Sequence, residues 1–146
     1  NSSSSAAAAS YDAEVIGHPS LRIFKLRLPE QYLSGVLDRI VAGCEAFAAT
    51  RPNGWQTNLY SLTKQDLALV DVGTKFMDLA RPITQYMCKA ICDLYHADQV
   101  QVDRNQPHVL KFSEGHTGVG LHHDRCDVTA NLMLSRSHTY VAGGYV

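Results

Sequence analysis

The pattern of apolar and polar residues in the first third of the chain predicts a strand followed by a helix. Residues 21–28 (Leu-Arg-Ile-Phe-Lys-Leu-Arg-Leu) alternate in part with a period of two, as a half-buried strand does. Pro29 ends this strand and suits the first turn of a helix. From Glu30 to Ala49 the apolar side chains recur at the spacing of an amphipathic helix: Leu33, Val36, Leu37, Ile40, Val41, Cys44 and Phe47.

A second amphipathic helix is predicted in the middle of the chain. Residues 51–54 (Arg-Pro-Asn-Gly) form a turn cluster, and a short strand is predicted from Trp55 to Leu62. Beyond it, an apolar stripe at helical spacing comprises Phe76, Leu79, Ala80, Ile83, Met87, Ala90, Ile91 and Leu94. Pro82 is expected to kink this helix near its first turns. We expect the two helices to form a layer that supports a sheet.

The last third of the sequence is rich in β-forming residues. Three short runs are predicted as strands: Val100–Val102, Val109–Phe112 and Val128–Leu134. In the last run Asp127, Thr129, Asn131, Met133 and Ser135 share one, mostly polar, face, and Val128, Ala130, Leu132 and Leu134 share the packed face. The order of strand, helices and then several strands predicts an α+β fold with its sheet in the C-terminal half.

Length and composition narrow the classes of protein to which the chain can belong. A chain of 146 residues fits one domain. Its first ten residues are rich in Ser and Ala and are predicted to be a low-complexity linker before that domain. Within residues 11–146 we expect helical support at 29–96 and a β-core at 99–146. With 13 basic and 14 acidic residues, the sequence shows no nucleic-acid footprint. It has no apolar run near the ~20 residues of a membrane span. The sequence has no initiator Met, so we expect it to be a piece of a longer product, and its compartment cannot be read.

The four cysteines do not form a recognisable metal or disulfide pattern. Cys88 and Cys92 are four residues apart in a helical pattern, and no second pair completes a zinc knuckle with them. Cys44 and Cys126 stand alone. We expect reduced thiols that pack as small apolar side chains.

The strongest chemical signal is the sequence His122-His123-Asp124. In an extended segment, residues two apart point to the same face, so His122 and Asp124 would lie together and His123 would point away. One imidazole and one carboxylate are two of the three ligands in the 2-His-1-carboxylate site of non-haem Fe(II) enzymes. His116 and His138 are expected to be loop residues. A plain surface hydrogen-bonded pair is the alternative for His122 and Asp124, because such short motifs also arise by chance.

Four segments in order resemble one enzyme family. They are residues 107–115 (Pro-His-Val-Leu-Lys-Phe-Ser-Glu-Gly), 121–124 (Leu-His-His-Asp), 129–135 (Thr-Ala-Asn-Leu-Met-Leu-Ser) and 140–144 (Tyr-Val-Ala-Gly-Gly). Together they resemble the prolyl 4-hydroxylase and lysyl hydroxylase branch of the Fe(II)- and 2-oxoglutarate-dependent dioxygenases. The resemblance covers about 40 residues, from Pro107 to Val146.

The resemblance implies a double-stranded β-helix (jelly-roll) core, of which this chain holds only the first part. It implies that His122 and Asp124 are iron ligands and that Asn131 contacts 2-oxoglutarate. Phe112 lies where the family often has Tyr, and it lacks the hydroxyl that would reach this co-substrate. In the family, a distal His and an Arg or Lys that pairs with 2-oxoglutarate follow the Gly-Gly pair. At the family's spacing, both positions would come after Val146.

The implied activity is hydroxylation of a peptidyl proline or lysine side chain by the complete domain. The implied cofactors are Fe(II) and 2-oxoglutarate, with ascorbate as a further candidate, and the implied partner is a peptide or protein substrate. No catalytic residue is expected beyond the metal ligands, and this chain alone is expected to show little or no turnover. The alternatives are a non-catalytic jelly-roll module for binding or scaffolding, and a truncated inactive relative.

Overall fold

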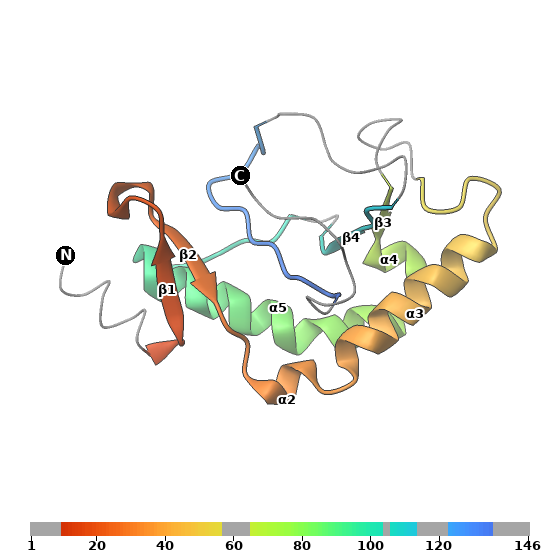
Figure 1. Ribbon diagram of the computed structural model, residues 1–146, viewed down its shortest axis with the longest axis horizontal. Coiled ribbons are helices and arrows are strands. Elements are labelled where there is room, and N and C mark those ends of the chain that lie inside the picture. The colour runs from red at the N-terminus through yellow and green to blue at the C-terminus, as the bar shows by residue number, and fades with distance from the viewer. Residues whose placement is uncertain (1–9, 57–64, 104–105, 114–122, 136–146) are drawn as a thin grey trace. The chain divides into compact units, whose positions relative to one another are not determined.

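The computed structural model describes residues 10–56, 65–103, 106–113 and 123–135 (Figure 1). The described residues form two compact units. The first unit gathers residues 10–34 and 80–103, and the second gathers residues 35–56, 65–79, 106–113 and 123–135. The longest helix, α5 (Thr74–Tyr95), contributes its first six residues to the second unit and the remainder to the first.

A hairpin and the C-terminal part of α5 build the first unit. Strands β1 (Ala13–Ile16) and β2 (Ile23–Leu26) pair antiparallel, with Ala13 opposite Leu26 and Ile16 opposite Ile23. A 3-10 turn, η1 (Pro19–Leu21), joins the two strands. The core of the unit consists of Tyr11, Ala90 and Leu94, with Ala13, Phe24, Leu26, Tyr86 and Tyr95 packed around them. The inner face of the hairpin therefore packs on the apolar stripe of α5.

The predicted strand at 21–28 is shorter in the structure, where β2 begins at Ile23. Leu21 belongs to η1, and Arg22 takes a left-handed conformation (φ 50°) that ends the turn. Pro29 precedes the single-turn helix α2 (Glu30–Leu33), as predicted.

The predicted helix over 30–49 is interrupted in the structure. It divides into α2 and α3 (Val36–Ala49), because Gly35 adopts a left-handed conformation with φ of 68° between them. Glycine adopts this conformation without the steric penalty of a side chain. The predicted turn at 51–54 is confirmed, since the N–H of Gly54 donates to the carbonyl of Arg51 at 3.1 Å.

The second unit combines α3 with a short two-stranded sheet. Strands β3 (Asp66–Ala68) and β4 (His108–Leu110) pair antiparallel, with Leu67 opposite Val109. Helix α4 (Leu69–Val72) follows β3 directly. Leu67 and Leu69 are almost fully buried, as are Ile40 and Cys44 of α3. These side chains form the apolar interior of this unit.

The α+β class is confirmed, and the second amphipathic helix is confirmed as α5. The predicted strand at 109–112 is confirmed in part by β4, which starts one residue earlier and ends at Leu110. Most of the predicted strand at 55–62 lies outside the described residues. Strand β3 was not predicted.

No jelly-roll core is present among the described residues, which contain two separate two-stranded sheets. The segments 100–102 and 128–134 were predicted as strands and carry no strand assignment. A strand requires a partner for its backbone hydrogen bonds, and the described part of the chain provides none for either segment. The alternation at 128–134 is visible in part: Val128, Leu132 and Leu134 are less exposed than Thr129, Asn131 and Met133, whereas Ala130 of the predicted packed face is exposed.

All four cysteines are free thiols, as predicted. Cys44 is buried and Cys88 and Cys92 are half-buried, whereas Cys126 is exposed and does not pack as an apolar side chain. No helix in the described part of the chain is both long enough and apolar enough to cross a membrane.

Candidate functional site

The carboxylate of Asp124 is held by a hydrogen bond within its own loop. The hydroxyl of Thr129 donates to Oδ2 of Asp124 at 2.6 Å, and the Cys126 thiol lies 3.3 Å from the same hydroxyl oxygen. All three side chains are exposed, and residues 125–127 bend between them. The His-X-Asp segment and the start of the Thr-X-Asn segment are thus joined by a direct contact.

His122 lies outside the described residues, so its predicted place beside Asp124 stays a prediction. His123 is described and exposed. The structure gathers no three His, Cys, Asp or Glu side chains in a metal-binding arrangement among the residues that it describes.

The donor chemistry at this position fits a hard divalent metal. A carboxylate and an imidazole are ligand types that Fe(II) accepts. Ligating carboxylates are commonly oriented by a further hydrogen-bond donor, and Thr129 occupies that role toward Asp124. Asp124 and His122 are therefore the residues of this chain that would hold an iron ion.

The two predicted co-substrate residues are both exposed. Asn131 lies in the irregular segment after Thr129. Phe112 is 57% exposed and follows β4. Both neighbours of Phe112 are hydrogen-bonded to Gln65: the Lys111 N–H donates to its carbonyl at 2.8 Å, and the Ser113 hydroxyl donates to its side chain at 2.9 Å. No strand of the described sheets carries Asn131, so the predicted polar strand face is not formed there.

A buried imidazole–carboxylate pair was missed by the sequence reasoning. The Nδ1 atom of His108 lies 3.3 Å from Oδ2 of Asp66, and both side chains are buried between β3 and β4. His108 falls within the segment that resembles the dioxygenases, but nothing in the pattern assigned it a role. The local signal for Asp66 is a single carboxylate directly before the apolar run Leu-Ala-Leu-Val.

A salt bridge fixes the position of β4 against α3. The ammonium group of Lys111 donates to Oε1 of Glu45 at 2.6 Å, and the indole N–H of Trp55 donates to Oε2 at 3.0 Å. The hydrogen bond from Lys111 lowers the pKa of Glu45 and that from Trp55 adds to this effect, although partial burial opposes it. Glu45 is therefore ionised at neutral pH and carries a structural ion pair.

Comparison with known proteins gave no match to a protein-family model, to a curated protein or to a solved structure.

Proposed function

We propose that this chain carries the first part of the metal centre of an Fe(II)- and 2-oxoglutarate-dependent hydroxylase. The observation that supports the proposal is the hydrogen bond from Thr129 to Asp124. It connects the two sequence segments on which the resemblance rests, and it gives the candidate ligand the kind of donor that orients metal-binding carboxylates.

In this proposal each residue has a separate role. His122 and Asp124 bind iron, Thr129 orients Asp124, and Asn131 donates a hydrogen bond to 2-oxoglutarate. Phe112 provides an apolar wall near the co-substrate. The resemblance implies a further His and a basic residue that complete such a site. A bound iron would supply the redox chemistry, in which O2 is the oxidant: one oxygen atom enters succinate as 2-oxoglutarate loses CO2, and the other becomes the hydroxyl group of the substrate.

The substrate in this proposal is a peptidyl proline or lysine side chain. A site of two His and one carboxylate with open coordination positions is typical of Fe(II) oxygenases, and Asp124 would supply its carboxylate. The protein contributes ligand geometry and the exclusion of competing reactions, while the redox chemistry belongs to the cofactor.

An anaerobic titration tests the proposal on the full-length polypeptide that contains this sequence. Fe(II) and 2-oxoglutarate are added together, and the visible charge-transfer absorption of an Fe(II)–2-oxo-acid chelate is recorded. The His122→Ala and Asp124→Ala variants are expected to lose this absorption. His123→Ala is the matched control, because this neighbouring imidazole is predicted to point away, and it is expected to keep the absorption.

Turnover is then measured as succinate formation with peptides that contain proline or lysine. Succinate that depends on iron, on Asp124 and on one of the two peptides supports the hydroxylase. An absorption that survives both ligand substitutions would mean that His122 and Asp124 are a plain surface pair. Peptide binding that is independent of iron would instead identify a non-catalytic binding module.

A further inference from the structure

The turn that follows α3 carries a chemically labile pair of residues. Asn53-Gly54 is the only Asn-Gly dipeptide in the sequence, and it ends the turn formed by residues 51–54 (Figure 1). The Asn53 side chain is exposed to solvent. In an Asn-Gly pair the backbone nitrogen of the glycine can attack the side-chain amide carbon of the asparagine, because glycine has no Cβ to shield that nitrogen or to restrict the backbone.

The space beside Gly54 is open among the described residues. Gly54 adopts a left-handed conformation with φ of 54°, and a Cβ atom at this position would meet no described atom within 4 Å apart from its chain neighbours. The backbone at Gly54 is therefore not held by packing on the side where a side chain would lie. Exposed turns of this kind belong to the least stable parts of a fold, and they open locally more often than the core does.

Two backbone hydrogen bonds hold the turn closed. The N–H of Gly54 donates to the carbonyl of Arg51 at 3.1 Å, and the N–H of Gln56 donates to the carbonyl of Asn53 at 3.0 Å. The first of these bonds engages the nitrogen that would attack the Asn53 side chain. Reaction in the folded chain therefore requires local opening of the turn, and the frequency of that opening limits its rate.

The side chain of Arg51 restrains the same turn. Its guanidinium donates to the carbonyl of Gly54 at 3.4 Å and to that of Gln56 at 3.2 Å, and it lies 5.3 Å from the centroid of the Phe47 ring. Both hydrogen bonds are at or beyond the long end of the usual range, and such bonds contribute modestly to stability. Arg51 therefore slows the opening of the turn without preventing it.

We propose that Asn53 is a site of spontaneous deamidation. In the opened turn the Gly54 nitrogen loses its proton to water and bonds to Cγ of Asn53, while the bond from Cγ to the side-chain nitrogen breaks. Ammonia leaves and a cyclic succinimide remains. Water then adds to either ring carbonyl: cleavage of the bond from the Gly54 nitrogen to Cγ yields aspartate, and cleavage of its bond to the backbone carbonyl carbon of Asn53 yields isoaspartate. The reaction needs no oxidant or reductant, and the inference does not rest on the proposed hydroxylase activity.

Either product changes the turn beside the contact that joins it to α3. A new carboxylate replaces the neutral amide, so the formal net charge of the chain falls by one from its value of −1. In isoaspartate the former backbone carbonyl of Asn53 becomes a free carboxylate, so the hydrogen bond that Gln56 donates to it no longer closes the same turn. The neighbouring residue is Trp55, whose indole N–H donates to Glu45 of α3 at 3.0 Å.

The test is incubation of the full chain at neutral pH in water enriched in ¹⁸O, followed by proteolysis and mass spectrometry. Each deamidation event incorporates an oxygen atom from water, so the label identifies the asparagine that reacted. Asn131 is the internal control, because it is also exposed but is followed by Leu132, whose side chain shields the backbone nitrogen. We expect Asn53 to react at least about tenfold faster than Asn131 and to yield both aspartate and isoaspartate.

Variants separate the intrinsic chemistry from the opening of the turn. Arg51→Ala removes the two side-chain hydrogen bonds that restrain the turn, and is expected to accelerate deamidation of the folded chain by about 2- to 10-fold. The matched control is Arg39→Ala, which removes an exposed guanidinium from α3 and is expected to leave the rate unchanged. In urea, where the turn is already open, Gly54→Leu is expected to slow the reaction at least about tenfold.

Equal rates at Asn53 and Asn131 in the folded chain would overturn the proposal. So would a Gly54→Leu variant that reacts in urea as fast as the unaltered chain. Equal rates for Arg51→Ala and Arg39→Ala would overturn the role given to opening of the turn.

Discussion

His108 and Asp66 form a buried pair, with 3.3 Å between Nδ1 and Oδ2 and with side-chain exposures of 8% and 3%. His108 lies opposite Ala68 in the antiparallel ladder, so Asp66, two residues before Ala68, is its diagonal neighbour on the same face. Removing the carboxylate leaves a buried polar group without this contact. We expect Asp66→Ala to lower the free energy of unfolding by about 1–3 kcal/mol in urea denaturation.

The control for this prediction is Asp71→Ala. Asp71 is an exposed carboxylate on α4, and its removal is expected to change stability by less than about 0.5 kcal/mol. Equal effects of the two substitutions would mean that the pair between β3 and β4 contributes nothing specific to stability.

Gly43 allows α3 and the start of α5 to approach closely. A Cβ atom at position 43 would overlap the ring of Phe76. We therefore expect Gly43→Ala to destabilise the protein by about 1–3 kcal/mol through overpacking, although alanine favours helices more than glycine does. Thermal unfolding followed by circular dichroism measures this change.

A double variant distinguishes this steric cause from other effects. Phe76→Leu shortens the side chain that meets position 43, so Gly43→Ala should cost less in that background. Additive effects of the two substitutions would contradict the predicted overlap.

Glu45 makes stability depend on pH in the acidic range. Hydrogen bonds from Lys111 and then Trp55 lower the pKa of Glu45 below its usual value of 4.5. The folded state therefore gains stability from the carboxylate above the unfolded pKa, and loses it as the pH falls through the folded pKa. Because the side chain is 47% exposed, we expect Glu45→Gln to cost no more than about 1 kcal/mol at neutral pH.

The effect of Glu45→Gln should be smaller at about pH 3 than at neutral pH, because the stability that the carboxylate contributes is lost as the pH falls through its lowered folded-state pKa. Urea unfolding at the two pH values measures it, with the fluorescence of Trp55, the sole tryptophan, as the signal. Glu30→Gln is the comparison variant, because Glu30 is an exposed carboxylate of the first unit. A Glu45→Gln effect that is the same at both pH values would argue against the ion pair.

The four thiols should react in the order of their exposure. Burial raises the pKa of Cys44 to about 11, and it raises that of Cys88 as well, whereas Cys126 is exposed. Because the thiolate is the reactive form, we expect a maleimide or disulfide reagent to label Cys126 first and Cys44 only after unfolding. Mass spectrometry of labelled peptides gives the order, and urea should remove the differences. Early labelling of Cys44 in the folded protein would contradict this arrangement.

Thr129 offers a test of the proposed metal site that leaves both of its ligands in this chain intact. Thr129→Val removes the hydroxyl that donates to Asp124 and preserves the size of the side chain. If Asp124 binds iron, this variant should lose about 10- to 100-fold in Fe(II) affinity, the effect of losing an outer hydrogen-bond partner. Thr129→Ser restores the donor and should recover most of the affinity. Equal affinities of the two variants would remove Thr129 from the site.

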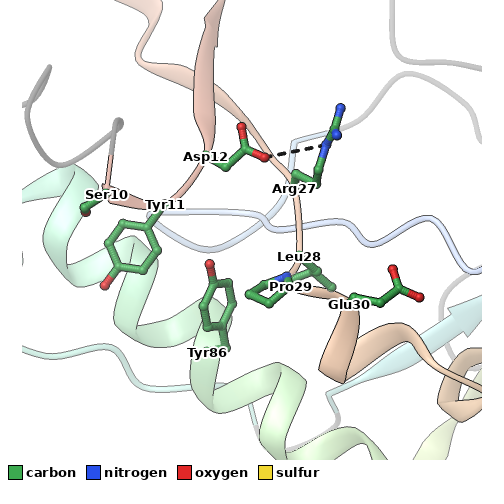
Figure 2. Close-up of a pocket in the computed structure, with 8 residues that line it drawn as sticks. All are labelled: Ser10, Tyr11, Asp12, Arg27, Leu28, Pro29, Glu30 and Tyr86. Carbon is green, nitrogen blue, oxygen red and sulfur yellow. Dashed lines mark ion pairs between the residues drawn. The ribbon is translucent and has the colours of Figure 1, made fainter.

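Local sequence was sufficient to predict the two long amphipathic helices and one turn, but not the short helix α4. The spacing of apolar residues predicts α5, which continues past Pro82 in its interior. The Arg-Pro-Asn-Gly cluster predicts the turn that follows α3. The division of the first helix escaped prediction, because the apolar period continues across Gly35 while the backbone there turns left-handed. A pocket on the first unit, lined by Tyr11 and Tyr86 among other residues (Figure 2), was equally unpredictable, because its walls meet only when the hairpin packs on α5.

The sequence by itself determined the alternation of helical and extended segments and placed His122, Asp124, Asn131 and Phe112 as candidate site residues. The segments and the pair His122 and Asp124 follow from spacing within a few positions, which decides which side chains share a face. Asn131 and Phe112 are named as co-substrate residues by the resemblance to the hydroxylase family. Only the tertiary structure decided the pairing of β3 with β4, the burial of Asp66 beside His108, and the contact between Thr129 and Asp124. The register between β3 and β4 is set by burial and strand pairing over about 40 residues, which no local pattern encodes.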